Sequence, residues 1–176
     1  RQGGVVKIPV RFTSSAMRAR FNPRDGQLYV AGLRGWQSNA AREGGFDRVR
    51  YTGAPAVLPT TLRATKTGVV VGFTAPLDAA TASDPERYAV EAWNYKWSSG
   101  YGSGEFPIRA EDGNTKGEGR STWTARSATV SADGRSVTLE IPEIQPVMQM
   151  RIQMKIKAAD GSPVSTEIHS TLHRLR

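Results

Sequence analysis

Strict alternation of apolar and polar residues over positions 150–158 is the feature that most constrains the fold of this chain. In the stretch Met-Arg-Ile-Gln-Met-Lys-Ile-Lys-Ala every even position is apolar and every odd position is polar. This period of two predicts an antiparallel β-strand with one face in a core and the other in solvent. The same alternation recurs at 137–141 and, more weakly, over 164–172.

Turn signals lie between or beside these strand-like stretches. Four Asp-Gly pairs occur, at 25–26, 112–113, 133–134 and 160–161, and this dipeptide is typical of tight turns between antiparallel strands. Only residues 77–87 and 39–42 favour a helix, and neither segment is long enough to be stable without tertiary support. We therefore predict an all-β protein with at most short helical turns.

A break in composition at residues 52–55 divides the chain into two segments. Residues 1–53 hold ten Lys and Arg against three acids, whereas residues 54–176 hold fourteen against thirteen. Three strand-like pieces precede the break with little apolar material between them, and about seven follow it at the spacing of a β-sandwich. We predict a basic, strand-rich segment over 1–53 that packs on the sandwich of 54–176 or on another chain.

Composition removes several classes of protein. The 176 residues include no cysteine, which rules out a disulfide framework, a thiolate metal cluster and a cysteine nucleophile. With 38% apolar and 23% charged residues, wholesale disorder is not expected. No apolar run approaches the roughly 18 residues that a membrane-spanning helix needs, so we predict no membrane span.

The two histidines, His169 and His173, are the natural candidates for catalysis or metal binding. Four residues apart on a strand, they would lie ~13 Å apart and could not share a metal ion. On a helix the same spacing would bring them together. Because the surrounding residues alternate as in a strand, we predict no metal site here.

Other chemical signals are weaker still. Carboxylate pairs such as Glu140 and Glu143 lie on polar strand faces or beside turns, and no Gly-x-Ser-x-Gly elbow occurs. The glycine-rich residues 100–104 lack the Lys-Ser/Thr of a phosphate-binding loop. The turn at 111–118 offers oxygen ligands for calcium, although its spacing differs from that of an EF-hand loop. We predict no catalytic residue and no cofactor, and leave a structural calcium ion open.

A run of aromatic residues rises above this background. If residues 88–97 form a strand, Tyr88, Val90 and Ala92 share one face, and Trp93, Tyr95 and Trp97 share the other. With the first face in the core, the three rings on the second form a row ~6–7 Å apart. Tyr101 follows in the glycine-rich loop.

Planar rings with polar edges can stack on the apolar faces of sugars. The predicted ligand-binding residues are Trp93, Tyr95, Trp97, Tyr101 and Lys96. Lys96 and nearby arginines favour an acidic polysaccharide. In the alternative interpretation the aromatic row covers residues 1–53 or docks on a domain outside this chain. Arginines interleaved with Phe21, Tyr29 and Trp36 could also hold a nucleic-acid strand, but no RRM, KH or zinc-finger signature accompanies them, so nucleic acid is not the expected partner.

Two stretches of the sequence resemble known families. Residues 20–36, Arg-Phe-Asn-Pro-Arg-Asp-Gly-Gln-Leu-Tyr-Val-Ala-Gly-Leu-Arg-Gly-Trp, resemble the closing blade of sorbosone-dehydrogenase-like β-propellers in large secreted bacterial proteins, and 46–53 fit the same pattern. Residues 59–175 resemble the bacterial immunoglobulin-like domain that follows such propellers. The pieces that carry this second resemblance are 70–74, 76–78, 84–90, 131–139 and 159–164.

The resemblance implies an immunoglobulin-like β-sandwich preceded by a blade-like segment, in a secreted or periplasmic protein. Together with the aromatic row, we predict from this a non-catalytic accessory module that binds carbohydrate or docks neighbouring domains. Its partner would then be a polysaccharide or a larger propeller-like or cytochrome-like chain. The alternative is the C-terminal fragment of a quinoprotein-type sugar dehydrogenase whose catalytic propeller lies elsewhere. A propeller needs several blades and this chain has at most one incomplete blade, so we predict no enzymatic activity for it.

Overall fold

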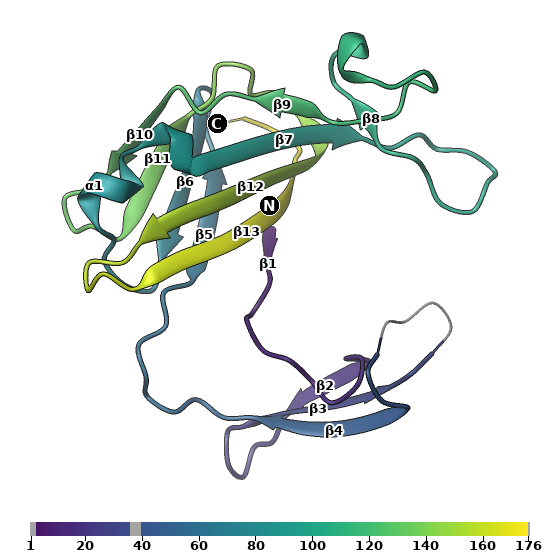
Figure 1. Ribbon diagram of the computed structural model, residues 1–176, viewed down its shortest axis with the longest axis vertical. Helices are drawn as coiled ribbons and strands as arrows, with labels where there is room; N and C mark the ends of the chain where they lie inside the picture. The colour runs from purple at the N-terminus through teal and green to yellow at the C-terminus, as the bar shows by residue number, and fades with distance from the viewer. Residues whose placement is uncertain (1–2, 36–39, 176) are drawn as a thin grey trace. The chain divides into compact units, whose positions relative to one another are not determined.

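The computed structural model describes residues 3–35 and 40–175. The prediction of an all-β protein is confirmed, because the described chain forms antiparallel sheets joined by turns and very short helices (Figure 1). It divides into two units, one made of residues 1–7 and 56–176 and the other of residues 8–55. We refer to them as the sandwich unit and the small unit.

Two sheets build the sandwich unit. The larger has the strand order β1 (Gly4–Val6), β13 (Pro163–Leu172), β12 (Val147–Lys157), β7 (Tyr88–Asn94) and β8 (Phe106–Pro107), with β9 (Ser121–Trp123) also paired to β7. The smaller has the order β10 (Ser127–Val130), β11 (Ser136–Glu140), β6 (Gly68–Phe73) and β5 (Pro59–Ala64). Buried side chains from both sheets form one hydrophobic cluster, which gives this unit its sandwich-like character.

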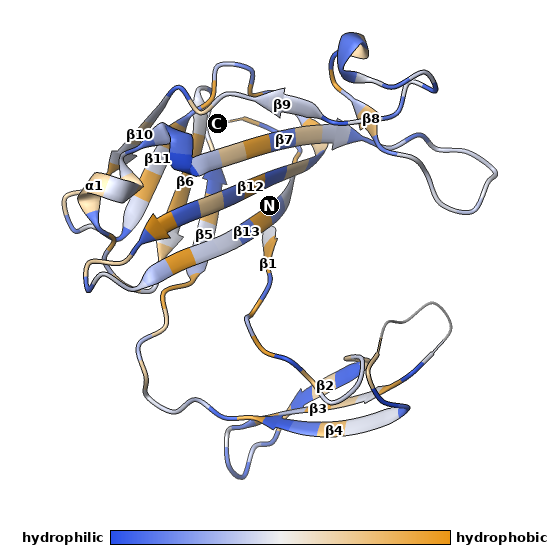
Figure 2. Cartoon of the chain, in the orientation of Figure 1, coloured by the Kyte–Doolittle hydropathy of each residue, from blue (hydrophilic) through white to orange (hydrophobic). Residues whose placement is uncertain are grey.

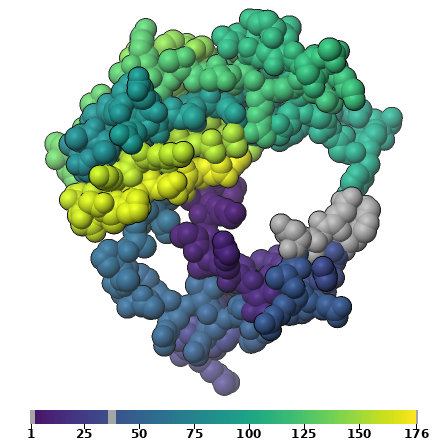
Figure 3. All heavy atoms as spheres, in the orientation of Figure 1, coloured from purple at the N-terminus to yellow at the C-terminus, as the bar shows by residue number. Residues whose placement is uncertain are grey.

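The alternation along β12 determines which of its faces enters the core. Met150, Ile152, Met154 and Ile156 are all buried, whereas the odd-numbered residues between them are exposed or partly exposed. Figure 2 shows the corresponding alternation of apolar and polar residues along the strand. Each such aliphatic side chain contributes about 1.5–3 kcal/mol when it is buried. The space-filling view in Figure 3 shows side chains filling the gaps that the ribbon leaves between these strands.

Three of the four Asp-Gly pairs form the hairpin turns that the sequence predicts. Gly26, Gly134 and Gly161 follow β2, β10 and β12 and have φ angles of +67°, +70° and +85°, which glycine adopts without strain. Gly113 differs, with a φ of −85° at the end of the 3₁₀ helix η2 (Ala110–Asp112). That helix was not predicted from the sequence.

The helical turn predicted within 77–87 is present as two short pieces. Helix α1 (Ala79–Ala82) begins after Asp78, whose carboxylate accepts a hydrogen bond from the backbone N–H of Thr81, as an N-cap does. The 3₁₀ helix η1 (Pro85–Arg87) follows. The second predicted segment, 39–42, is not helical over 40–42, and residue 39 lies outside the described residues.

The small unit is a three-stranded antiparallel sheet in the order β2 (Arg18–Phe21), β3 (Leu28–Leu33) and β4 (Gly44–Val49). Segment 13–15 crosses one face of this sheet where Gly32 and Gly45 pair. A Cβ atom on Gly32 would lie 1.3 Å from the carbonyl oxygen of Ser15. Asp47 accepts hydrogen bonds from the backbone N–H and the hydroxyl of Thr13, at 2.9 and 2.6 Å. Backbone proximity therefore takes the place of a hydrophobic layer on this face.

The division between the units lies close to the predicted boundary at 53/54, but the first strand is placed differently. β1 pairs with β13 in the sandwich unit, with Val5 opposite His169. The sequence alone predicts this strand as part of the basic segment 1–53. Short strands carry too little periodicity to reveal which sheet they will join, because pairing is decided by contacts distant in sequence.

Candidate functional site

The three predicted rings of the aromatic row do not share one environment. Tyr88, Val90 and Ala92 face the core as expected, but Trp93 on the opposite face is only 2% exposed. The guanidinium of Arg120 lies 3.9 Å from the centroid of the Trp93 ring, and His169 approaches the ring edge-on at 6.4 Å. The predicted open row of three rings is therefore corrected, because side chains of the sandwich unit itself cover the first ring.

Three hydrogen bonds to carboxylates hold Arg120 over Trp93. Its Nε and Nη2 donate to the two oxygens of Glu105 at 2.6 and 2.8 Å, and its Nη1 donates to Glu91 at 3.0 Å. The hydrogen bond from Arg120 lowers the pKa of Glu105, and the same carboxylate raises the pKa of the guanidinium. The planar fork of arginine suits this two-point contact, so Arg120 acts as a fixed cover.

The same outer face continues as a ladder of ion pairs across the sheet. Arg151 on β12 lies opposite Glu91 on one side and His169 on the other, and its Nη2 lies 2.5 Å from Glu91. Glu167 lies 3.5 Å from His169 through the Oε1 and Nε2 atoms. The Arg151 guanidinium thus contacts the carboxylates of Glu91 and Glu167 on the two neighbouring strands, so this part of the face presents no open aromatic surface.

The open aromatic side chains lie instead in the loop between β7 and β8. We call residues 95–103 the aromatic loop; it extends away from the sheets (Figure 1). Tyr95 is 40% exposed, and Trp97 and Tyr101 are fully exposed. Because β7 ends at Asn94, the strand alternation that predicted a regular row does not reach Tyr95 or Trp97.

Hydrogen bonds within and beside the loop shape its base. The hydroxyl of Tyr95 accepts from the indole N–H of Trp93 at 3.0 Å, which ties the partly exposed ring to the buried one. The backbone N–H of Lys96 donates to the Ser103 hydroxyl at 2.9 Å, and the Lys96 Nζ lies 3.9 Å from the centroid of the Phe106 ring. Of the five predicted ligand-binding residues, Trp97 and Tyr101 thus remain freely accessible, Tyr95 and Lys96 flank them, and Trp93 is enclosed.

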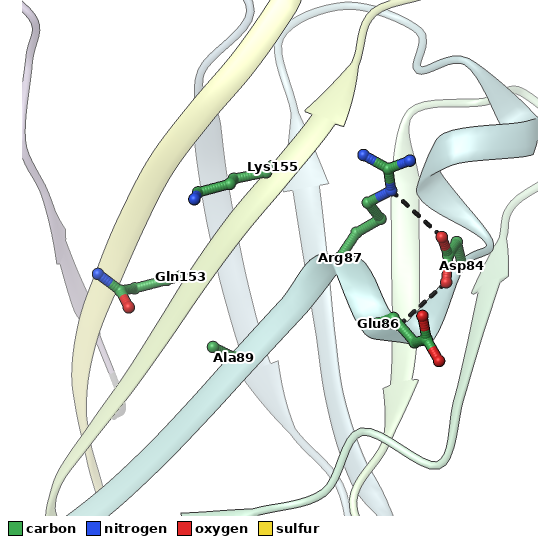
Figure 4. A pocket seen from close by; sticks show the side chains of 6 residues that line it. All are labelled: Asp84, Glu86, Arg87, Ala89, Gln153 and Lys155. Atoms are coloured by element: carbon green, nitrogen blue, oxygen red, sulfur yellow. Dashed lines mark hydrogen bonds and ion pairs between the residues drawn. The ribbon is translucent and has the colours of Figure 1, made fainter.

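Two shallow hollows also lie on the outer face of the larger sheet. One, of about 450 Å³, is shown in Figure 4 and is lined by Asp84, Glu86, Arg87, Ala89, Gln153 and Lys155. Arg87 donates to Asp84 at 3.2 Å across its rim. The other, of about 400 Å³, includes His169 and His173. Both are open and lined mainly by polar side chains, unlike the apolar clefts that hold small molecules.

The histidines and carboxylates show no constellation for catalysis within the described residues. His169 lies in β13 and His173 follows the last residue of that strand. The two histidines are therefore spaced along a strand and not along a helix. No group of three or more metal-ligating side chains forms among the residues that the structure describes. Glu140 pairs with Arg126, and Glu143 accepts from the backbone N–H of Thr124.

The electrostatics also differ from those of an acid catalyst. Wherever the pKa of a described carboxyl group departs clearly from its usual value, it lies below that value. In Asp112, hydrogen bonds from Ser121 and Arg109 cause the lowering. A general acid at neutral pH needs a raised pKa, so these carboxylates suit structural contacts.

Comparisons with known proteins add no family to this description. No protein-family model matches the sequence, no curated protein matches it, and no solved structure matches the fold. Across residues 3–35 and 40–175, no helix has the length and apolar character of a membrane span.

Proposed function

We propose that this protein is a non-catalytic binding module that uses its aromatic loop to stack Trp97 and Tyr101 against a carbohydrate. The observation that supports this most directly is the full exposure of both rings. Large exposed aromatic side chains favour association, because covering them removes apolar area from water. Their flat faces and polar edges suit the alternating apolar and hydroxyl-bearing surfaces of a sugar chain.

An acidic polysaccharide is the ligand class that the charges favour. The chain carries a net charge of +8, and long-range attraction raises the association rate of an oppositely charged polymer. Lys96 lies within the loop itself, next to Trp97 in the sequence. We further propose an immunoglobulin-like sandwich in a secreted or periplasmic protein of several domains, as the sequence resemblance implies.

The second candidate is a fragment of a larger sugar dehydrogenase whose catalytic propeller lies in another part of the assembly. The three-stranded antiparallel sheet β2–β3–β4 supports this candidate, since a propeller blade has four such strands. Co-purification with a larger chain that oxidises sugars in a dye-linked assay would favour it. A stable, inactive monomer would count against it.

Binding measurements on loop variants test the carbohydrate proposal. Trp97→Ala and Tyr101→Ala should each weaken binding to polygalacturonate or dextran sulfate by roughly tenfold, the effect of losing about 1.4 kcal/mol of contact energy. The measurement is isothermal titration calorimetry with neutral dextran in parallel. Tyr51→Ala, at a position that is 79% exposed outside the loop, is the matched control. Retention of full affinity in both loop variants would overturn the proposal.

A further inference from the structure

One face of the small unit gathers arginine and aromatic side chains in two adjacent rows. Strand register places Arg20, Tyr29 and Arg48 opposite one another, and the next row on the same face holds Arg18, Ala31 and Phe46. Side chains two residues apart on a strand point to the same side. We call this surface the arginine face.

In the part of the chain that the structure describes, none of the cations of the arginine face is held in a close ion pair, although the Asp25 carboxylate lies near enough to Arg48 for the two charges to attract each other. Within the described residues, no ion pair joins Arg18, Arg20 or Arg48 to an acid. Arg18 and Arg20 each donate one hydrogen bond to a backbone carbonyl of the preceding residue, at 3.2 and 2.8 Å. Each guanidinium has five donors, so most of theirs remain available.

The acids of the small unit are directed elsewhere. Residues 8–55 contain eight arginines and no lysine, against Asp25, Glu43 and Asp47, a net charge of +5. Asp47 lies on the opposite face, where Thr13 donates to it. Asp25 lies in the turn at the end of the face, and the Tyr29 hydroxyl donates to it at 2.8 Å. Arginines therefore outnumber acids on the arginine face, and Asp25 at its end is the acid that interacts with Tyr29 and Arg48.

Two rings complete the face. Tyr29 and Phe46 stack with their centroids 5.7 Å apart and their planes at 27°. Phe46 is still 72% exposed. Arg20 and Arg48 belong to the two outer strands, ~10 Å apart across the sheet, a span on the scale of two sugar rings. The exposed ring of Phe46 can contact a sugar while the guanidinium groups of Arg20 and Arg48 bind its charged substituents through paired hydrogen bonds.

We propose that the arginine face binds the carboxylate or sulfate groups of an acidic polysaccharide. A polysaccharide fits better than a nucleic acid, because Tyr29 and Phe46 stack on each other and leave little open ring surface beyond that of Phe46. Single-stranded nucleic acids need successive stacking surfaces. The inference shares its ligand class with the proposed function, but it depends on different residues in a different unit.

The experiment uses the full chain with the triple variant Arg18→Gln, Arg20→Gln and Arg48→Gln. Its affinity for polygalacturonate and dextran sulfate should fall at least tenfold, and the salt dependence of binding should become shallower. The matched control is Arg11→Gln, Arg24→Gln and Arg42→Gln, which removes the same charge from the same unit outside its strands. This control should lose less than threefold in affinity.

Further variants and ligands distinguish the possible results of this experiment. The triple arginine-to-lysine variant keeps the charge but cannot form the paired hydrogen bonds of a guanidinium, so it should bind with intermediate affinity. This variant tests the proposal even if the glutamine variant fails to fold. Equal losses in the face variant and the control would overturn the proposal, as would tighter binding of an oligothymidine than of either polysaccharide. If Trp97→Ala leaves affinity intact while the face variant loses it, the loop proposal fails and this one stands. If Trp97→Ala loses affinity while the face variant keeps it, the proposal for the arginine face fails and the loop proposal stands.

Discussion

At the scale of single residues, Arg120 decides what Trp93 can do. The two residues are far apart in the sequence, yet the guanidinium lies over the indole, 3.9 Å from its centroid, and is held there by Glu105 and Glu91. A residue pattern centred on β7 contains no information about this cover. The predicted strand faces hold only up to Trp93, because β7 ends at Asn94 before Tyr95 and Trp97. A side chain from outside the strand covers Trp93 itself.

We expect Arg120→Ala to lower the free energy of unfolding by about 1–2 kcal/mol. The variant removes a cation–π contact and two partly exposed ion pairs, with Glu105 and Glu91, which are individually modest. It should also increase acrylamide quenching of tryptophan fluorescence, because Trp93 would become accessible. Arg120→Lys keeps the positive charge but not the planar guanidinium, so its stability and quenching should lie between those of the unmodified protein and Arg120→Ala. Unchanged quenching in Arg120→Ala would show that other side chains suffice to cover the ring.

At the scale of elements, the strands with the clearest alternation were the most predictable. β12 follows its pattern from Met150 to Ile156 because a sheet with one buried face needs apolar residues at every second position. β7 follows the same rule up to Asn94, where the strand ends. The glycine and serine residues beyond it indicate a loop, but they do not show how open its rings will be.

Gly68, the first residue of β6, tests how closely two strands of the smaller sheet approach. A Cβ atom there would lie 1.8 Å from the carbonyl oxygen of Leu139 on β11. We expect Gly68→Ala to lower the free energy of unfolding by about 1–3 kcal/mol, since the backbone must shift to relieve the overlap. Urea denaturation followed by circular dichroism measures the change. Gly100→Ala, whose added methyl would make only an ordinary contact at 3.5 Å, should be nearly neutral, and an equal loss there would contradict the explanation.

At the scale of the whole molecule, the two units differ sharply in how many apolar side chains they bury. The sandwich unit encloses side chains such as Val71, Val90 and Ile152. In the small unit, the buried apolar residues among those described are Val30 and Ala40, while Phe21, Phe46 and others are exposed. A small sheet with so little burial gains limited stability from its own packing.

Hydrogen exchange should reveal this difference directly. We expect amides in the centre of the sandwich unit, such as those of Val90 and Ile152, to exchange on the order of 100-fold more slowly than those of Tyr29 and Arg48 in the small unit. Exchange from stable strands requires large openings, whereas weakly packed sheets open locally at low cost. The measurement is amide exchange by NMR at neutral pH on the full chain. Equal protection in both units would mean that the small unit is stabilised by more than its own core.

The sequence by itself determined that this chain is all-β and where its long strands run, through local periodicity and turn chemistry. Its composition also showed that the excess of basic over acidic residues is concentrated in residues 1–53. Those properties are written in neighbouring residues, because strand faces alternate and Asp-Gly pairs turn the backbone locally. Tertiary structure alone decided that β1 joins the sandwich, that Trp93 is covered while Trp97 and Tyr101 stay open, and that three arginines share one sheet face. Each of those outcomes depends on which distant strands become neighbours, and no local pattern of residues encodes that choice.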